Sequence, residues 1–97
     1  MIHHTVLFRF VPEVRAEQLE AAREALLGMP KAIPFIRGIA FGPNLAPSAD
    51  TYSHVLEVQL DDMAAVNAYL EHPEHNRVVS EYIHPIRESR LAVDLEV

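Results

Sequence analysis

The chain contains no cysteine and no tryptophan, and it has no apolar run long enough to cross a membrane. Without cysteine, a disulfide framework, a thiolate zinc site and a cysteine nucleophile are all excluded. The first residues, Met1 to His4, lack the basic start and apolar stretch of a signal peptide. We therefore expect a soluble cytoplasmic protein.

Basic residues are also few. Eight Lys and Arg stand against fourteen Asp and Glu, which gives a formal net charge of −6, and the basic residues are scattered singly along the chain. Nucleic acids and anionic membranes select clustered positive charge, so we expect neither as a partner. The length of 97 residues suits one domain with a single core, spanning residues 1–97.

The first half of the chain has a strand, helix, strand pattern. Residues 2–10 alternate between an apolar and a mixed face, which is typical of a strand. Residues 16–27 carry apolar side chains at helical spacing, and Gly28 suits the end of that helix. Residues 35–41 are predicted to form a second strand, followed by a loop through Pro47, Ser48 and Asp50.

The second half of the chain has a strand, helix, strand pattern as well. Residues 51–60 alternate as a strand whose apolar face includes His54. Asp61 is the predicted N-cap of a helix with the apolar stripe Met63, Val66, Tyr69 and Leu70. Proline favours the first turn of a helix, so Pro73 is expected to end this helix and begin another. Residues 91–97 alternate again and predict a final strand.

This order predicts an α+β fold of the ferredoxin-like βαββαβ type, with a four-stranded antiparallel sheet and helices on one face. In that topology we expect the first and third strands to lie side by side in the centre and to run parallel. His4 and His54 each lie near the start of their strand on the apolar side. They are therefore expected to be near neighbours beneath the helices.

The run His72-Pro73-Glu74-His75 is the most informative stretch of the sequence. Tyr69 and His75 would point to different sides of one straight helix, and only a break at Pro73 can bring them together. A neutral imidazole beside a phenol is a suitable acid/base pair. With His4 and His54, these groups could converge on one cleft. Alternatively, His72 and His75 cap and pack the junction, or the buried polar groups form a closed structural network.

Other polar residues give weaker signals. His72 and His75 could offer two nitrogens to a metal, but a site needs three or four ligands, and Glu71 and Glu74 fit solvated helix positions. We expect no metal site. His3 and His84 are expected at the surface or at an interface, and Tyr82 is expected to pack in the core.

Four segments resemble one known family. They are His4-Thr5-Val6-Leu7-Phe8-Arg9-Phe10, Tyr52-Ser53-His54-Val55-Leu56-Glu57-Val58, Ala68-Tyr69-Leu70-Glu71-His72-Pro73-Glu74-His75 and Leu91-Ala92-Val93-Asp94. In this order they are similar to the stress-responsive α/β-barrel (Dabb) domain family. The resemblance covers nearly the whole chain and implies a ferredoxin-like protomer that pairs with a second copy into a dimeric α+β barrel. It implies no activity by itself.

The resemblance extends to the olivetolic acid cyclase branch of that family, which closes a polyketide without metal or organic cofactor. It implies that His75 is a general base, that Tyr69 is a catalytic tyrosine, and that His4 and His54 line the pocket. We also expect His72 to contact the substrate. Two hypotheses follow. The chain is a homodimeric stress-responsive protein with a small-molecule pocket for a carbonyl or aromatic ligand, or it is a cofactor-free acid/base enzyme of cyclase, lyase or isomerase type.

The sheet face away from the helices is half apolar, because the alternation of the strands assigns to it Thr5, Leu7, Arg9, Val55, Glu57 and Gln59. Such a face could be solvated, or it could pair with its own copy across a two-fold axis. In that homodimer, Arg9 of one copy is expected to meet Glu57 of the other.

Overall fold

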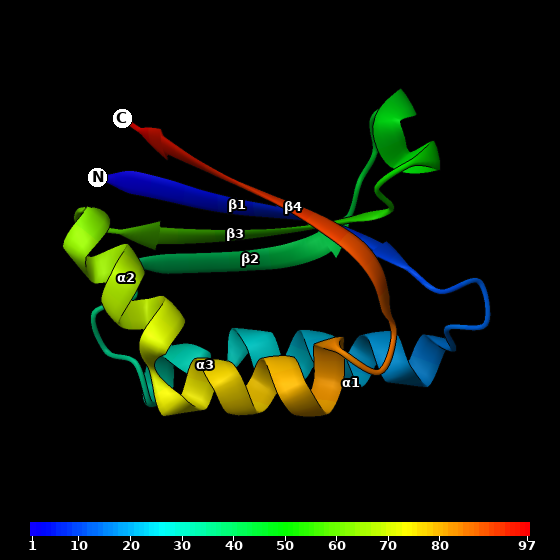
Figure 1. The fold of residues 1–97 in the computed structure, drawn as a ribbon, viewed down its shortest axis with the longest axis horizontal. Helices are drawn as coiled ribbons and strands as arrows, with labels where there is room; N and C mark the ends of the chain where they lie inside the picture. Colours follow the sequence, from blue (N-terminus) through cyan, green and yellow to red (C-terminus); the bar gives the residue numbers. More distant parts are fainter.

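The computed structural model describes all residues, Met1–Val97, as one sheet covered by helices on one face (Figure 1). The strands β1 (Ile2–Phe10), β2 (Gly38–Pro43), β3 (His54–Leu60) and β4 (Arg87–Glu96) form an antiparallel sheet in the order β2-β3-β1-β4. The helices are α1 (Ala16–Leu27), α2 (Met63–Glu71) and α3 (Pro73–Val78). Short 3₁₀ turns span Met29–Lys31 and Pro47–Asp50, and a π-helical turn spans Val79–Ile83. The predicted ferredoxin-like fold is confirmed.

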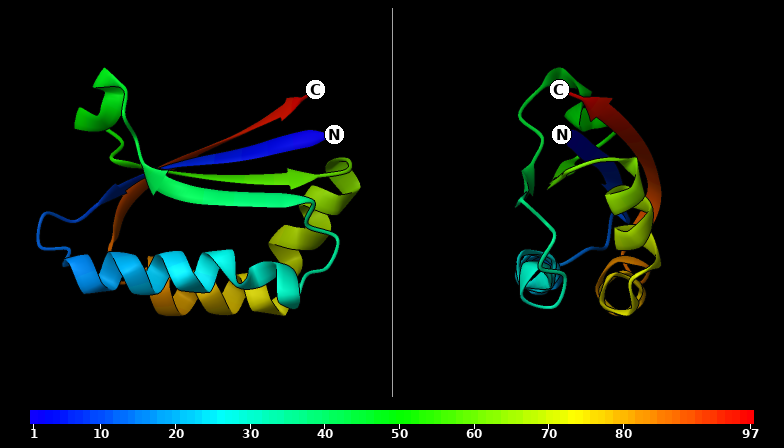
Figure 2. Two further views of the ribbon diagram at one scale, coloured as in Figure 1. Left: turned by 180° about the vertical axis from the view of Figure 1, so that it is seen from behind. Right: turned by 90° about the vertical axis from the view of Figure 1, so that its left-hand side faces the viewer.

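The sheet and the helices form two layers (Figure 2), and the hydrophobic core lies between them. Alternate residues of β1 point into it, and α1 contributes Ala22 and Leu26. Tyr82 packs against this core from the π-helical turn, as predicted. No helix is both long and apolar enough to span a membrane.

The strand directions correct one expectation. β1 and β3 are neighbours, as predicted, but they are antiparallel, with Ile2 opposite Leu60 and Phe8 opposite His54. The helix between β1 and β2 returns the chain so that β2 runs in the direction of β1, and the following turn reverses β3. His4 therefore pairs with Val58, and His4 and His54 lie toward opposite ends of the sheet. The expectation that they are near neighbours is wrong.

The break at Pro73 is confirmed. α2 ends at Glu71 and α3 begins at Pro73, with His72 in an extended conformation between them. The Nδ1 atom of His72 accepts a hydrogen bond from the backbone N–H of Glu74 at 3.1 Å and caps α3. A capped helix start at this point turns the chain and changes the direction in which His75 projects.

Several element boundaries differ from the prediction. The N-cap of α2 is Asp62, whose side chain accepts from Ala65 N–H at 2.8 Å, whereas Asp61 forms two hydrogen bonds with Arg37. β2 and β3 each begin three residues later than expected, because turns precede both. β4 begins at Arg87, four residues earlier than expected. Its apolar residues Leu91, Val93 and Leu95 face away from the helices, since Leu91 pairs with Leu7.

Candidate functional site

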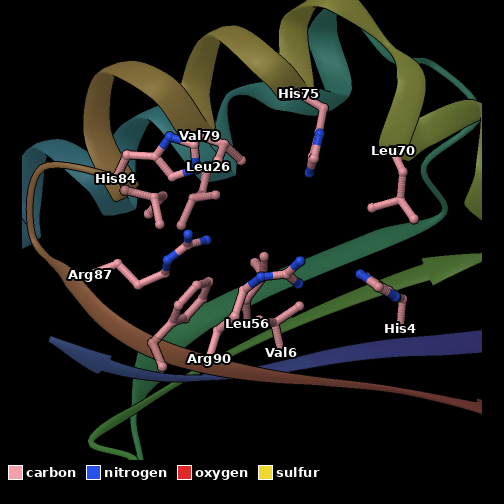
Figure 3. A pocket seen from close by; sticks show the side chains of 12 residues that line it. His4, Val6, Leu26, Leu56, Leu70, His75, Val79, His84, Arg87 and Arg90 are labelled. Carbon is pink, nitrogen blue, oxygen red and sulfur yellow. The ribbon is translucent and has the colours of Figure 1, made fainter.

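A cavity of about 200 Å³ opens between the sheet and the helices (Figure 3). Twelve residues line it: His4, Val6, Phe8, Leu26, Leu56, Leu70, His75, Val79, Ile83, His84, Arg87 and Arg90. Seven of them are hydrophobic, and the other five are histidines and arginines. An apolar cavity with a few convergent polar groups is the usual form of a small-molecule site.

His4 is the one buried polar residue of the chain, with 4% of its surface exposed. Its Nδ1 atom lies 2.6 Å from Oδ1 of Asp94, its partner across the β1–β4 ladder. A carboxylate only accepts hydrogen bonds, so Nδ1 carries the proton that it donates to Asp94. This bond fixes the ring orientation, and His4 lines the cavity.

Tyr69 links the two cavity histidines. Its ring centroid lies 5.8 Å from that of His4 and 4.6 Å from that of His75, in edge-on arrangements. The predicted approach of Tyr69 and His75 is thus present, and His4 joins the cluster. The three rings form one continuous series of edge-on contacts from the sheet to α3.

The Tyr69 side chain packs behind the cavity lining, and only 1% of the residue is exposed. Burial raises the pKa of its phenol above the ordinary value of 10.0, so the hydroxyl stays protonated at neutral pH. Every buried side-chain nitrogen or oxygen has a partner, yet none of the side-chain hydrogen bonds within the chain involves the Tyr69 hydroxyl. The hydroxyl therefore retains at most a slight exposure, because only 1% of the residue is accessible.

His75 projects from α3 toward the sheet and the cavity (Figure 3). Burial lowers its pKa below the ordinary value of 6.5, and the nearby charges of His4 and Arg90 act in the same direction. A 3.4 Å contact between its Nδ1 atom and the side-chain oxygen of Asn76 opposes this shift. His75 is therefore neutral at physiological pH, which is the state required to accept a proton.

The structure does not bring His54 or His72 to this cavity. The ring of His54 packs between Phe10 and Phe41, with centroids at 5.1 Å and 5.7 Å, and its Nδ1 atom lies 2.8 Å from the Ser53 hydroxyl. Burial lowers the pKa of His54. His72 serves as the helix cap described above.

Four residues of the site were not predicted as such: His84, Arg87, Arg90 and Asp94. His84 is exposed, as expected, but it borders the cavity. Asp94 could have been found by pairing β4 with β1, because the antiparallel register sets it opposite His4. No group of three or more His, Cys, Asp or Glu side chains is arranged to hold a metal ion.

The sequence profile described as the stress responsive A/B barrel domain, Dabb, matches residues 2–97. None of the curated proteins compared with the chain matches it. The matches to solved structures cover nearly the whole chain.

A dimeric ferredoxin-like protein of unknown function from Thermobifida fusca is 33% identical, with a TM-score of 0.84 over 99% of this chain and 90% of that one. Another dimeric protein of unknown function, from Bacteroides fragilis, is 31% identical, with a TM-score of 0.84 over 99% and 95% of the two chains. The hydroxynitrile lyase of Passiflora edulis is 17% identical, with a TM-score of 0.86 over 99% and 92%. At that identity the likeness concerns the fold alone.

Proposed function

The chain belongs to the Dabb family of stress-responsive α/β-barrel proteins, and because a shared fold does not assign an activity, we propose its function from the cavity itself. The proposal is a cofactor-free acid/base enzyme that acts on a small carbonyl compound. His75 is its general base and Tyr69 is its hydrogen-bond donor. His4, which Asp94 holds in place, supports the ring of Tyr69.

The observation that carries this proposal is the state and position of His75. Its imidazole lines the cavity, and burial keeps its pKa below 6.5, so it is ready to accept a proton at neutral pH. No ion pair engages the side chain: its polar partners are the side-chain oxygen of Asn76, at 3.4 Å, and the backbone of Leu70, and its ring packs edge-on against Tyr69. A base with a pKa near the working pH contributes about 10²–10⁴-fold to a rate.

The reaction step needs no co-reactant. His75 removes a proton from a carbon next to the carbonyl group, and the C–H electron pair forms a C=C bond while the carbonyl π pair moves to oxygen. The Tyr69 hydroxyl, which stays protonated because its pKa is raised, donates a hydrogen bond to that oxygen, which requires the substrate to reach between the lining residues His4 and His75 that Tyr69 contacts. The enolate then takes the proton back at another atom, attacks a second carbonyl or expels a leaving group. These three outcomes correspond to an isomerase, a cyclase and a lyase.

A second candidate is a stress-responsive protein that binds a small ligand without transforming it. The near-complete burial of His4 and Tyr69 favours it, because buried polar groups that pack edge to edge also stabilise a fold. The two candidates share the cavity and differ in whether His75 transfers a proton.

Proton exchange distinguishes them without knowledge of the natural substrate. The α-hydrogens of phenylpyruvate and acetylacetone are followed by NMR in D₂O with the wild-type protein and with His75→Asn. The enzyme proposal predicts catalysed exchange by the wild type and at least about 10²-fold less with the variant. Equal exchange by both proteins would sink it and leave the binding function.

We also propose that the chain forms a homodimer through the sheet face away from the helices. Three large apolar residues of β4 are exposed there, Leu91 at 45%, Val93 at 48% and Leu95 at 62%. An apolar strip of this size on a sheet face is suited to a self-complementary interface. Within the chain Arg9 lies 2.5 Å from Glu88, and Glu57 lies 3.4 Å from His3, so the expected Arg9 to Glu57 contact between copies requires these pairs to rearrange.

A further inference from the structure

Two arginines that are three positions apart face the same cavity. In a regular strand, residues three apart point to opposite faces. β4 is irregular at this point: Arg87 pairs with Phe10 and Ser89 with Arg9, so Glu88 is an extra residue. This β-bulge turns Arg87 to the same side as Arg90, which pairs with Phe8. Both arginines line the cavity, next to the helix-facing residues of β1 (Figure 3).

Neither arginine has a counter-ion in the chain. The ion pairs of the structure engage Arg9, Arg15, Arg23, Arg37 and Arg77, which are all of the other arginines. No Asp or Glu lines the cavity. The nearby acidic residues are occupied, because Glu88 pairs with Arg9 and Asp94 with His4. In a chain with a net charge of −6, this cavity is a local concentration of unpaired positive charge.

We propose that Arg87 and Arg90 bind the carboxylate of a small ligand whose apolar body lies against Val6, Phe8 and Leu56. This inference names the substrate class, a small carboxylic acid. It therefore rests on the proposed function. Guanidinium groups match planar carboxylates, because two parallel N–H groups can donate to the two oxygens.

The size and lining of the cavity favour this class. A volume of about 200 Å³ is below the roughly 300–1,000 Å³ of drug-sized sites and corresponds to the liquid volume of roughly seven waters. Seven of the twelve lining residues are hydrophobic, so a bare inorganic anion would leave most of the wall without a partner. With the carboxylate at the arginines on β4, the body of the ligand extends toward His75 on α3.

The test is an NMR titration with three probes: benzoate, benzamide as its uncharged counterpart, and inorganic phosphate. The wild type is compared with Arg87→Gln/Arg90→Gln, which removes two positive charges from the cavity, and with Arg23→Gln, which removes one positive charge from the exposed side of α1. Benzoate is expected to shift the signals of Val6, Phe8 and His75, and to bind more tightly than benzamide or phosphate. The double variant should weaken benzoate binding by about tenfold or more, whereas Arg23→Gln should leave it unchanged.

A second double variant distinguishes a lost binding group from a misfolded protein. Arg87→Lys/Arg90→Lys keeps both charges but loses the planar fork, and it should weaken benzoate binding while benzamide binding stays the same. The inference is overturned if benzoate leaves the cavity signals unchanged, if benzamide or phosphate binds as tightly as benzoate, or if both double variants retain wild-type affinity. His75→Asn should still bind benzoate, so a failure of the catalytic proposal leaves this result unaffected.

Discussion

The Nδ1 atom of His4 lies 2.6 Å from Oδ1 of Asp94, although the two residues are 90 positions apart in the chain. This contact joins the first and last strands at the floor of the site, with His4 almost fully buried and the Asp94 side chain 31% exposed. His4 in turn supports the edge of Tyr69, which touches His75. A contact in the sheet therefore bears on the position of the proposed base in the helix layer.

Replacing Asp94 with Ala is expected to destabilise the protein by about 1–3 kcal/mol, because the buried Nδ1–H of His4 loses its acceptor. The partial exposure of Asp94 lets water replace it in part, which puts the expected value near the lower end. Urea unfolding measures the change. Glu96→Ala, on the same strand and the same face but without a side-chain partner, is the matched control and should be close to neutral. Equal values for the two variants would contradict the role of the His4–Asp94 bond.

Two substitutions separate the hydroxyl of Tyr69 from its ring. Tyr69→Ala should cost about 3–5 kcal/mol, because it empties a large buried site beside His4 and His75. Tyr69→Phe keeps the ring and should change stability by less than about 1 kcal/mol, because the hydroxyl has no partner within the chain. Under the proposed mechanism, Tyr69→Phe nevertheless loses proton-exchange activity. A Tyr69→Phe variant with full activity would exclude the hydroxyl as the donor.

The buried histidines predict a loss of stability in mild acid. Burial lowers the pKa of His75 and of His54 below 6.5, so the unfolded chain takes up their protons first as the pH falls. The contribution of these histidines to stability is therefore expected to be constant above about pH 6.5, to decrease as the pH falls from there toward the lower pKa values of the folded state, and to level off below them. Urea midpoints measured between about pH 7.5 and about pH 5 test the direction. His75→Asn should show a weaker dependence, and an unchanged slope would indicate that His75 does not titrate in this way.

The proposed dimer predicts a specific disruption. Val93→Glu/Leu95→Glu adds two charges to the exposed face of β4. The isolated chain should lose little stability, but a dimer would have to bury both charges. Light scattering at micromolar concentration should give a dimer mass for the wild type and a monomer mass for the variant. Glu96→Gln, on the opposite face of the same strand, should remain dimeric. A wild-type monomer would contradict the assembly.

Much of the fold was predictable, because alternation and helical spacing are local signals. Strand β1 and helix α1 have the predicted bounds, Ile2–Phe10 and Ala16–Leu27, and Pro73 marks the boundary between α2 and α3. These features depend on backbone rules that act within a few residues.

The site was only partly predictable. The approach of Tyr69 and His75 follows from the break at Pro73, which a sequence displays directly. The separation of His4 from His54 depends on strand direction, which follows from tracing the chain through the whole topology. Arg87 and Arg90 were missed because both precede the predicted strand 91–97, and because a spacing of three puts two side chains on opposite faces of a strand unless a bulge such as that at Glu88 intervenes.

The pH dependence of α-hydrogen exchange tests the central claim, that His75 is a neutral base, most directly. The rate of exchange of phenylpyruvate is measured across the pH range with the wild type and with His75→Asn. For the wild type, the account predicts a rate that rises with pH to a plateau, with a midpoint below 6.5 because burial lowers the pKa of His75. The variant should lack this step and be slower throughout. The same profile and rate in both proteins would contradict the assignment of His75 as the base.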